Sequence, residues 1–104
     1  MEREIGFAVI YTFEVIEGQQ EQFIEAWTRL TELIREHRGG LGSRLHRDEQ
    51  GRFVAYAEWP SREVFAADTP LPDEADEVIA SMRASMSARD EPWFLASERD
   101  LLQR

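Results

Sequence analysis

Residues 52–66, RFVAYAEWPSREVFA, predict a strand that ends in a tryptophan and turns at once into a helix. The strand's side chains alternate between two faces. One face carries Phe53, Ala55, Ala57 and Trp59. Pro60 cannot donate to a sheet ladder, so it ends the strand, and Ser61 can cap the following helix. Trp59 is therefore expected at the seam between sheet and helix, where small α+β domains often open a cleft.

The length and composition predict a single domain over residues 1–104. A chain of this length can bury one hydrophobic core. No apolar run approaches the roughly 20 residues that a membrane helix needs, and the charged start MEREIGF lacks the apolar centre of a signal peptide. Cysteine is absent, which excludes disulfides and thiolate chemistry. We expect a cytoplasmic protein without membrane contact.

The charge balance and the missing motifs exclude several functions. The net charge of −9 argues against nucleic acid as a partner, because phosphate binding needs a cationic surface. All 12 basic residues are arginine, so no lysine can form a Schiff base or serve a P-loop. The two histidines lie nine residues apart without metal-ligand spacing. We expect no metal and no cofactor.

Residues 5–15 alternate between an apolar odd-numbered face and a smaller, mixed even-numbered face, which predicts the first strand. Glu17-Gly18 forms the turn into a helix over residues 19–37, and Gly39-Gly40 ends that helix. Residues 41–47 then form a strand that pairs with 53–59 through a short loop, with Leu45 opposite Ala55 and Ser43 opposite Ala57.

The helix that Ser61 caps breaks near residues 68–72, where two prolines stand two apart. The break is either a mobile lid or a structural kink. The stripe of the resumed helix consists of Ala75, Val78, Ile79, Met82 and Met86. Residues 92–101 complete the chain as a strand. The order β-α-β-β-α-β predicts an α+β, ferredoxin-like fold, with a four-stranded antiparallel sheet and two helices on one face.

The other sheet face has no predicted cover. It carries Ala8, Ile10, Thr12, Arg44, His46, Val54, Tyr56 and Glu58. This face is too apolar to leave bare and too polar for the core of a monomer, so we expect a homodimer that packs its sheets face to face. The alternative is a monomer with a half-wetted sheet.

Two stretches, FAVIYTFEVIEGQQEQFIEAW and EHRGGLGSRLHRDEQGRFVAYAEWPSREVF, resemble the antibiotic biosynthesis monooxygenase family. The anchors are Glu17-Gly18, Gly40, the short hairpin, and Glu58-Trp59 ahead of a helix that carries Phe65. The resemblance covers residues 7–67, and the rest matches in element order alone. It implies a dimeric α-β barrel, a pocket between helices and sheet, and cofactor-free oxygenation of polyketide-type aromatic substrates.

A haem-degrading branch of the family uses an asparagine on the first strand, a tryptophan that ends the third strand, and a histidine on the second helix. Trp59 alone carries over. Tyr11 stands where the asparagine would be, and no histidine lies between Val64 and Pro92. The resemblance therefore argues strongly against haem degradation.

We predict catalytic roles for Trp59 as a pocket wall, Tyr11 as a hydrogen-bond donor to a substrate oxygen, and His37 as a base. The predicted substrate-binding residues are Phe7, Val9, Phe13, Trp27, Phe65, Met82 and Met86. Aromatic and methionine side chains suit a flat aromatic ligand, although core packing alone would also explain them. The alternatives to a monooxygenase are a non-catalytic binding or structural homodimer, and a lactone isomerase or polyketide cyclase.

Overall fold

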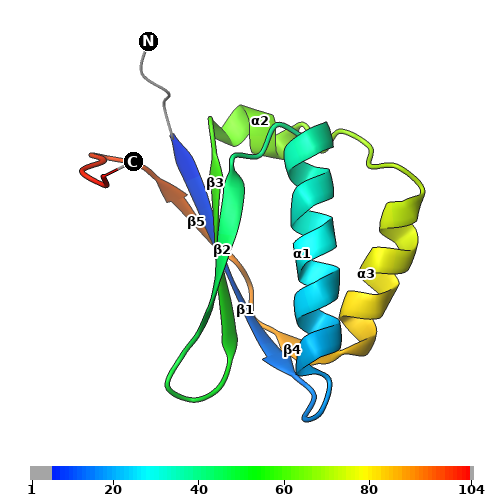
Figure 1. The fold of residues 1–104 in the computed structure, drawn as a ribbon. Coiled ribbons are helices and arrows are strands. Elements are labelled where there is room, and N and C mark those ends of the chain that lie inside the picture. The colour runs from blue at the N-terminus through cyan, green and yellow to red at the C-terminus, as the bar shows by residue number, and fades with distance from the viewer. Residues whose placement is uncertain (1–5, 104) are drawn as a thin grey trace.

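A five-stranded antiparallel sheet carries helices on one of its two faces, as Figure 1 shows for the computed structural model. The structure describes residues 6–103, so Ile5 of the predicted first strand lies outside the described residues. The strands are β1 (Phe7–Val15), β2 (Gly42–Arg47), β3 (Phe53–Trp59), β4 (Met86–Arg89) and β5 (Trp93–Ala96). The helices are α1 (Gln20–His37), α2 (Arg62–Ala66) and α3 (Glu74–Ala84). The α+β, ferredoxin-like prediction is confirmed.

The middle of the sheet follows the predicted pairing. β3 lies between β2 and β1, and Leu45 pairs with Ala55 and Ser43 with Ala57. The predicted cap is also present, because the Ser61 side chain accepts a hydrogen bond from the Val64 N–H at 3.2 Å. The loop that joins β2 to β3 therefore holds the register that places Trp59 on the helix side.

The end of the chain differs from the predicted strand over residues 92–101. β4 pairs with Phe13–Val15 at one end of β1, and β5 pairs with Phe7–Ile10 at the other end. Pro92 lies between them and has no N–H to donate to the ladder, which explains the interruption. No strand forms in residues 97–103.

Met86 was predicted on the stripe of the last helix, and that placement is wrong. α3 ends at Ala84, and Met86 begins β4 opposite Val15. The intervening Ser85 is fully buried, and its hydroxyl donates to the Met82 carbonyl at 2.6 Å. Its own carbonyl accepts from the Ile16 N–H. This backbone bond to the end of β1 draws the chain into the sheet.

The helices pack on the sheet through two aromatic clusters. One joins Phe13, Phe53 and Ala55 of the sheet to Phe23 of α1. The other holds Phe7, Val9 and Trp59, with Phe65 of α2 against it. Phe13 of the first cluster and Trp59 of the second both line the cavity that forms the candidate site.

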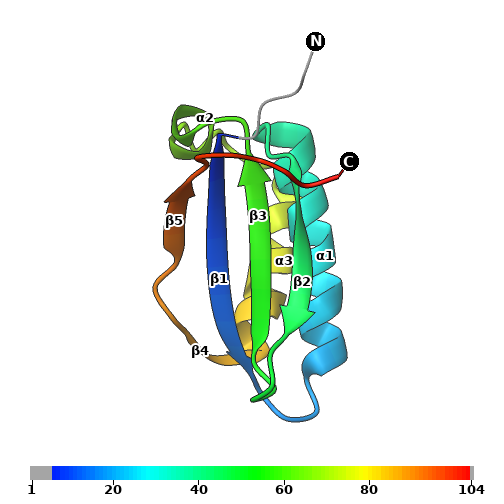
Figure 2. The ribbon, with the colours of Figure 1, turned by 90° about the vertical axis from the view of Figure 1, so that its left-hand side faces the viewer.

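Among the residues that the structure describes, no helix covers the opposite sheet face (Figure 2). The pairing of Ile10 with Trp93 and of Ala8 with Leu95 places both β5 side chains on this face. Trp93 is 68% exposed. The last described residues cross one end of the face (Figure 2), where Leu102 lines a groove together with Gly42 and Arg44 of β2. Within residues 6–103, no helix has the length and apolar character to cross a membrane.

Candidate functional site

A cavity of about 270 Å³ lies between the helices and the covered sheet face. Its aromatic walls come from Tyr11 and Phe13 of β1, Trp59 of β3 and Trp27 of α1. Met82 of α3 adds a thioether. The volume is close to the lower end of the range for small-molecule sites, roughly 300–1,000 Å³. An apolar, ring-lined space of this size suits a small aromatic compound.

Trp59 is held firmly at one wall of this cavity. Its side chain is only 5% exposed, and its ring meets the Phe65 ring edge-on with 5.3 Å between centroids. The loop after α1 passes close to the indole at Gly40. A Cβ there would lie 3.2 Å from Ile34 Cγ2 and 3.5 Å from Trp59 Cη2. The absence of a side chain at Gly40 thus lets the loop and the indole close this end of the cavity together.

Tyr11 contributes a phenol to the same cavity. Burial raises its pKa above the usual value, and the charges of Arg89 and Arg38 partly offset this effect. The hydroxyl forms no hydrogen bond with any group in the described part of the chain. At neutral pH it is therefore a protonated donor that is available to a ligand.

The raised pKa gives a testable pH dependence. A group whose pKa is higher in the folded state stabilises the fold below the unfolded pKa and loses that contribution as pH rises through the folded value. We expect the free energy of unfolding to fall above about pH 10, and Tyr11→Phe to reduce that fall. Denaturant unfolding of wild type and Tyr11→Phe at neutral and alkaline pH measures this loss of unfolding free energy. Identical alkaline slopes in both proteins would contradict it.

Three arginines also line the cavity: Arg35 and Arg38 near the end of α1, and Arg89 on β4. Arg38 Nε donates to the Thr69 carbonyl at 2.6 Å, and its Nη2 lies 3.2 Å from Asp68 Oδ1. This pair of contacts ties α1 to the segment between α2 and α3. The segment predicted as a break in the helix is therefore held at two points by Arg38, which lines the cavity.

The cavity brings together five of the predicted site residues. These are Tyr11, Phe13, Trp27, Trp59 and Met82. Phe7 and Val9 lie in the core beside Trp59, Phe65 packs on the far side of the indole, and Met86 packs against the Phe13 cluster. None of these four lines the cavity.

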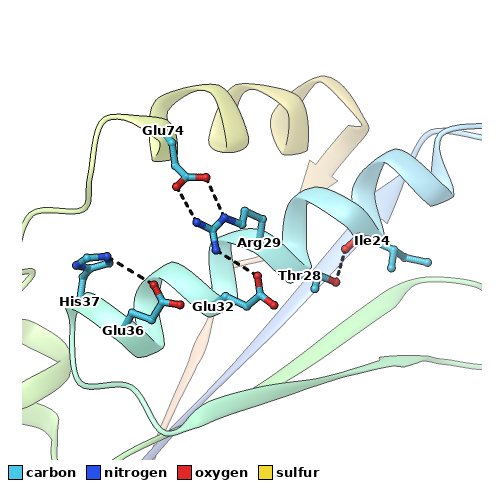
Figure 3. Close-up of polar contacts among 7 residues, drawn as sticks. All are labelled: Ile24, Thr28, Arg29, Glu32, Glu36, His37 and Glu74. Carbon is cyan, nitrogen blue, oxygen red and sulfur yellow. Dashed lines mark hydrogen bonds and ion pairs between the residues drawn. The ribbon is translucent and has the colours of Figure 1, made fainter.

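His37 is not brought to the cavity either. It is the last residue of α1, its side chain is exposed, and its Nε2 lies 3.7 Å from Glu36 Oε2 (Figure 3). On the same helix, Arg29 binds both carboxylate oxygens of Glu74 at 2.7 and 2.9 Å, which ties α1 to α3. The Arg29–Glu74 pair thus holds the two helices together, whereas the contact of His37 with Glu36 stays within α1.

Sequence reasoning missed the cationic part of the lining. Arg38 was visible only as a charge in the last turn of a helix, which the helix dipole explains by itself. Arg89 carried no signal, because the strand that presents it was not predicted. Within residues 6–103, no group of three His, Asp or Glu side chains is placed to hold a metal ion.

Comparisons with known proteins agree with this architecture. The sequence profile described as Antibiotic biosynthesis monooxygenase matches residues 6–69. A search of curated proteins finds no match. One similar structure is that of SnoaB from Streptomyces nogalater, described as a cofactor-independent oxygenase, with 17% identity, a TM-score of 0.73, and coverage of 95% of this chain and 99% of that one.

Two further structures belong to proteins assigned provisionally to antibiotic biosynthesis monooxygenases. The protein from Chloroflexus aurantiacus has 20% identity and a TM-score of 0.73, with 90% of this chain and 94% of that chain covered. The protein from Caulobacter crescentus has 17% identity and a TM-score of 0.74, with 93% of each chain covered. At these identities the three structures establish a shared fold.

Proposed function

The chain belongs to the antibiotic biosynthesis monooxygenase family, and we propose that it oxygenates a small aromatic substrate, without metal or flavin, in the cavity beside Trp59. The observation that carries the proposal is the cavity itself, which combines the two indoles of Trp27 and Trp59 with the phenol of Tyr11. SnoaB, described as a cofactor-independent oxygenase, shares the fold and supports the same reaction class.

The proposed reaction needs little from the protein besides binding and charge stabilisation. An anthrone-type substrate has an acidic CH₂ across the central ring from its carbonyl, conjugated with it through the flanking aromatic rings. Loss of one proton from this CH₂ to solvent gives an aromatic enolate. The enolate transfers one electron to O₂, and the two resulting radicals combine through a C–O bond to give a peroxide anion. This anion takes up a proton from solvent and becomes a hydroperoxide. Loss of water then leaves a carbonyl, with one oxygen atom in the quinone and the other in the water.

Tyr11 and Trp59 have different roles in this scheme. The protonated Tyr11 hydroxyl donates to the enolate oxygen, where negative charge develops. Trp59 and Trp27 hold the ring by contact and exclude water. His37 lies away from the cavity and takes no step, and the substrate proton passes to solvent.

Oxygen uptake tests the proposal. Wild-type protein is mixed with dithranol, a hydroxylated anthrone, and with a panel of quinols, and uptake is compared with the spontaneous rate in buffer. We expect faster uptake with at least one substrate and transfer of one labelled oxygen atom into the product. Binding of these compounds without accelerated uptake would favour a ligand carrier. Conversion without uptake would favour an isomerase or cyclase.

We also propose that two copies pack through their helix-free sheet faces. Ile10 and Val54 lie partly buried there, and the exposed Trp93 and Leu95 extend the apolar surface onto β5. Exposed apolar surface of this kind marks an interaction site, and a two-fold dimer covers both copies with one contact.

Light scattering at micromolar concentration tests the dimer. We expect a mass about twice the 12.1 kDa of one chain. Ile10→Glu should give the single-chain mass, because it buries a charge in the contact. Ile24→Glu, on the outer surface of α1 where Ile24 is 38% exposed, is the matched control and should stay dimeric. A wild-type protein of single-chain mass would contradict the proposal.

A further inference from the structure

We propose that the cavity selects aromatic substrates that carry a carboxylate, and that Arg89, with Arg38 and Arg35, binds this group. The inference deepens the proposed function and rests on it for the aromatic ring beside Trp59. The carboxylate is a recognition group, separate from the carbon that reacts with oxygen.

The first support is the contrast between the cavity and the rest of the chain. The protein has a net charge of −9, yet three of its 12 basic residues line this one cavity. Glu58 is the only acidic residue in the described lining. The local potential thus opposes the net charge, as expected where an anion must enter an otherwise acidic protein.

The second support is that arginine charges reach Tyr11 from two different walls of the cavity. Arg89 pairs with Phe13 across β1 and β4, so both side chains lie on the helix side of the sheet. Arg38 approaches from the end of α1. The charges of both arginines act on the Tyr11 phenol and oppose the rise that burial causes in its pKa. A ligand oxygen near Tyr11 therefore lies within the field of both guanidinium groups.

The third support is the state of the guanidinium groups. Arg38 is partly neutralised by Asp68, with 3.2 Å between Nη2 and Oδ1. Arg89 and Arg35 form no ion pair or hydrogen bond through their side chains with any residue from 6 to 103. A guanidinium presents paired donors that match a carboxylate. Arg89 is therefore placed to bind the carboxylate, while the ring lies against Trp59 and Trp27.

Calorimetric titration with naphthoic acid and its uncharged amide, naphthamide, tests the inference without any turnover. At neutral pH and low salt we expect naphthoate to bind about tenfold more tightly than naphthamide. The preference should shrink as salt is added. Arg89→Gln should weaken naphthoate binding about tenfold and leave naphthamide unchanged. Arg83→Gln, a change of the same charge on α3 away from the cavity, is the matched control and should bind both as wild type does.

The outcomes separate this inference from the proposed function. Equal affinity for the two probes, no binding of naphthoate, or equal effects of Arg89→Gln and Arg83→Gln would overturn the inference, even if oxygen uptake occurs. Arginine-dependent naphthoate binding without oxygen uptake by any anthrone or quinol would uphold the anion site and overturn the oxygenase proposal.

Discussion

Tyr11→Phe is expected to lower kcat for oxygen uptake with dithranol by about 100-fold to 1,000-fold. The substitution removes one oxygen atom and keeps the ring that packs against Phe13 with 6.1 Å between centroids. A tyrosine phenol is protonated at neutral pH, and burial raises the pKa of Tyr11 further, so the variant loses a donor for the developing enolate oxygen. Because this interaction strengthens as charge develops, the loss should appear mainly in kcat and much less in KM.

The control for Tyr11→Phe is Tyr56→Phe. Tyr56 is the other tyrosine of the chain, and it lies on β3 opposite Ile10, on the face away from the cavity. Oxygen electrode assays should give Tyr56→Phe a kcat close to that of wild type, and circular dichroism should show both variants folded. A Tyr11→Phe protein that keeps kcat within about threefold of wild type would remove Tyr11 from the mechanism.

Trp59→Ala is expected to reduce the free energy of unfolding by about 3–5 kcal/mol. The indole is 5% exposed and packs with Phe7, Val9 and Phe65 where sheet and α2 meet. Its removal merges the space that it fills with the existing cavity, and the rings around it lose their contacts.

Denaturant unfolding measures this change, with Ile24→Ala as the control. Ile24 is 38% exposed on α1, so its truncation should cost within about 0.5 kcal/mol. Equal losses in the two variants would show that Trp59 is not a packing centre. Trp59→Phe should retain most of the stability and weaken dithranol binding, which separates the role in the fold from the role in the cavity.

The middle of the sheet could be predicted from the sequence because its pattern has one solution. Alternating apolar residues in β1 and β3, with a short loop before β3, leave one register that buries Phe53 and Trp59 together. The same register placed Tyr11 and Trp59 on one face. The aromatic residues of the candidate site could be predicted from that placement.

The arginines that line the cavity could not be predicted in the same way. β4 and β5 are four residues each and pair with β1 through backbone groups, which leave little trace in side-chain patterns. The sequence pattern therefore assigns Arg89 to no element and continues the last helix through Met86. His37 is predicted as a base, yet it is the last residue of α1 and lies exposed beside Glu36.

The three tryptophans provide the most direct test of where the substrate binds. Trp27 and Trp59 line the cavity, and Trp93 lies on the opposite sheet face. Their indole N–H resonances can be followed by NMR during anaerobic titration with dithranol, with assignment by single Trp→Phe variants. We predict saturable shifts for Trp27 and Trp59 and none for Trp93. Shifts confined to Trp93, or no shift at Trp59 at saturating ligand, would show that the aromatic substrate does not bind beside Trp59.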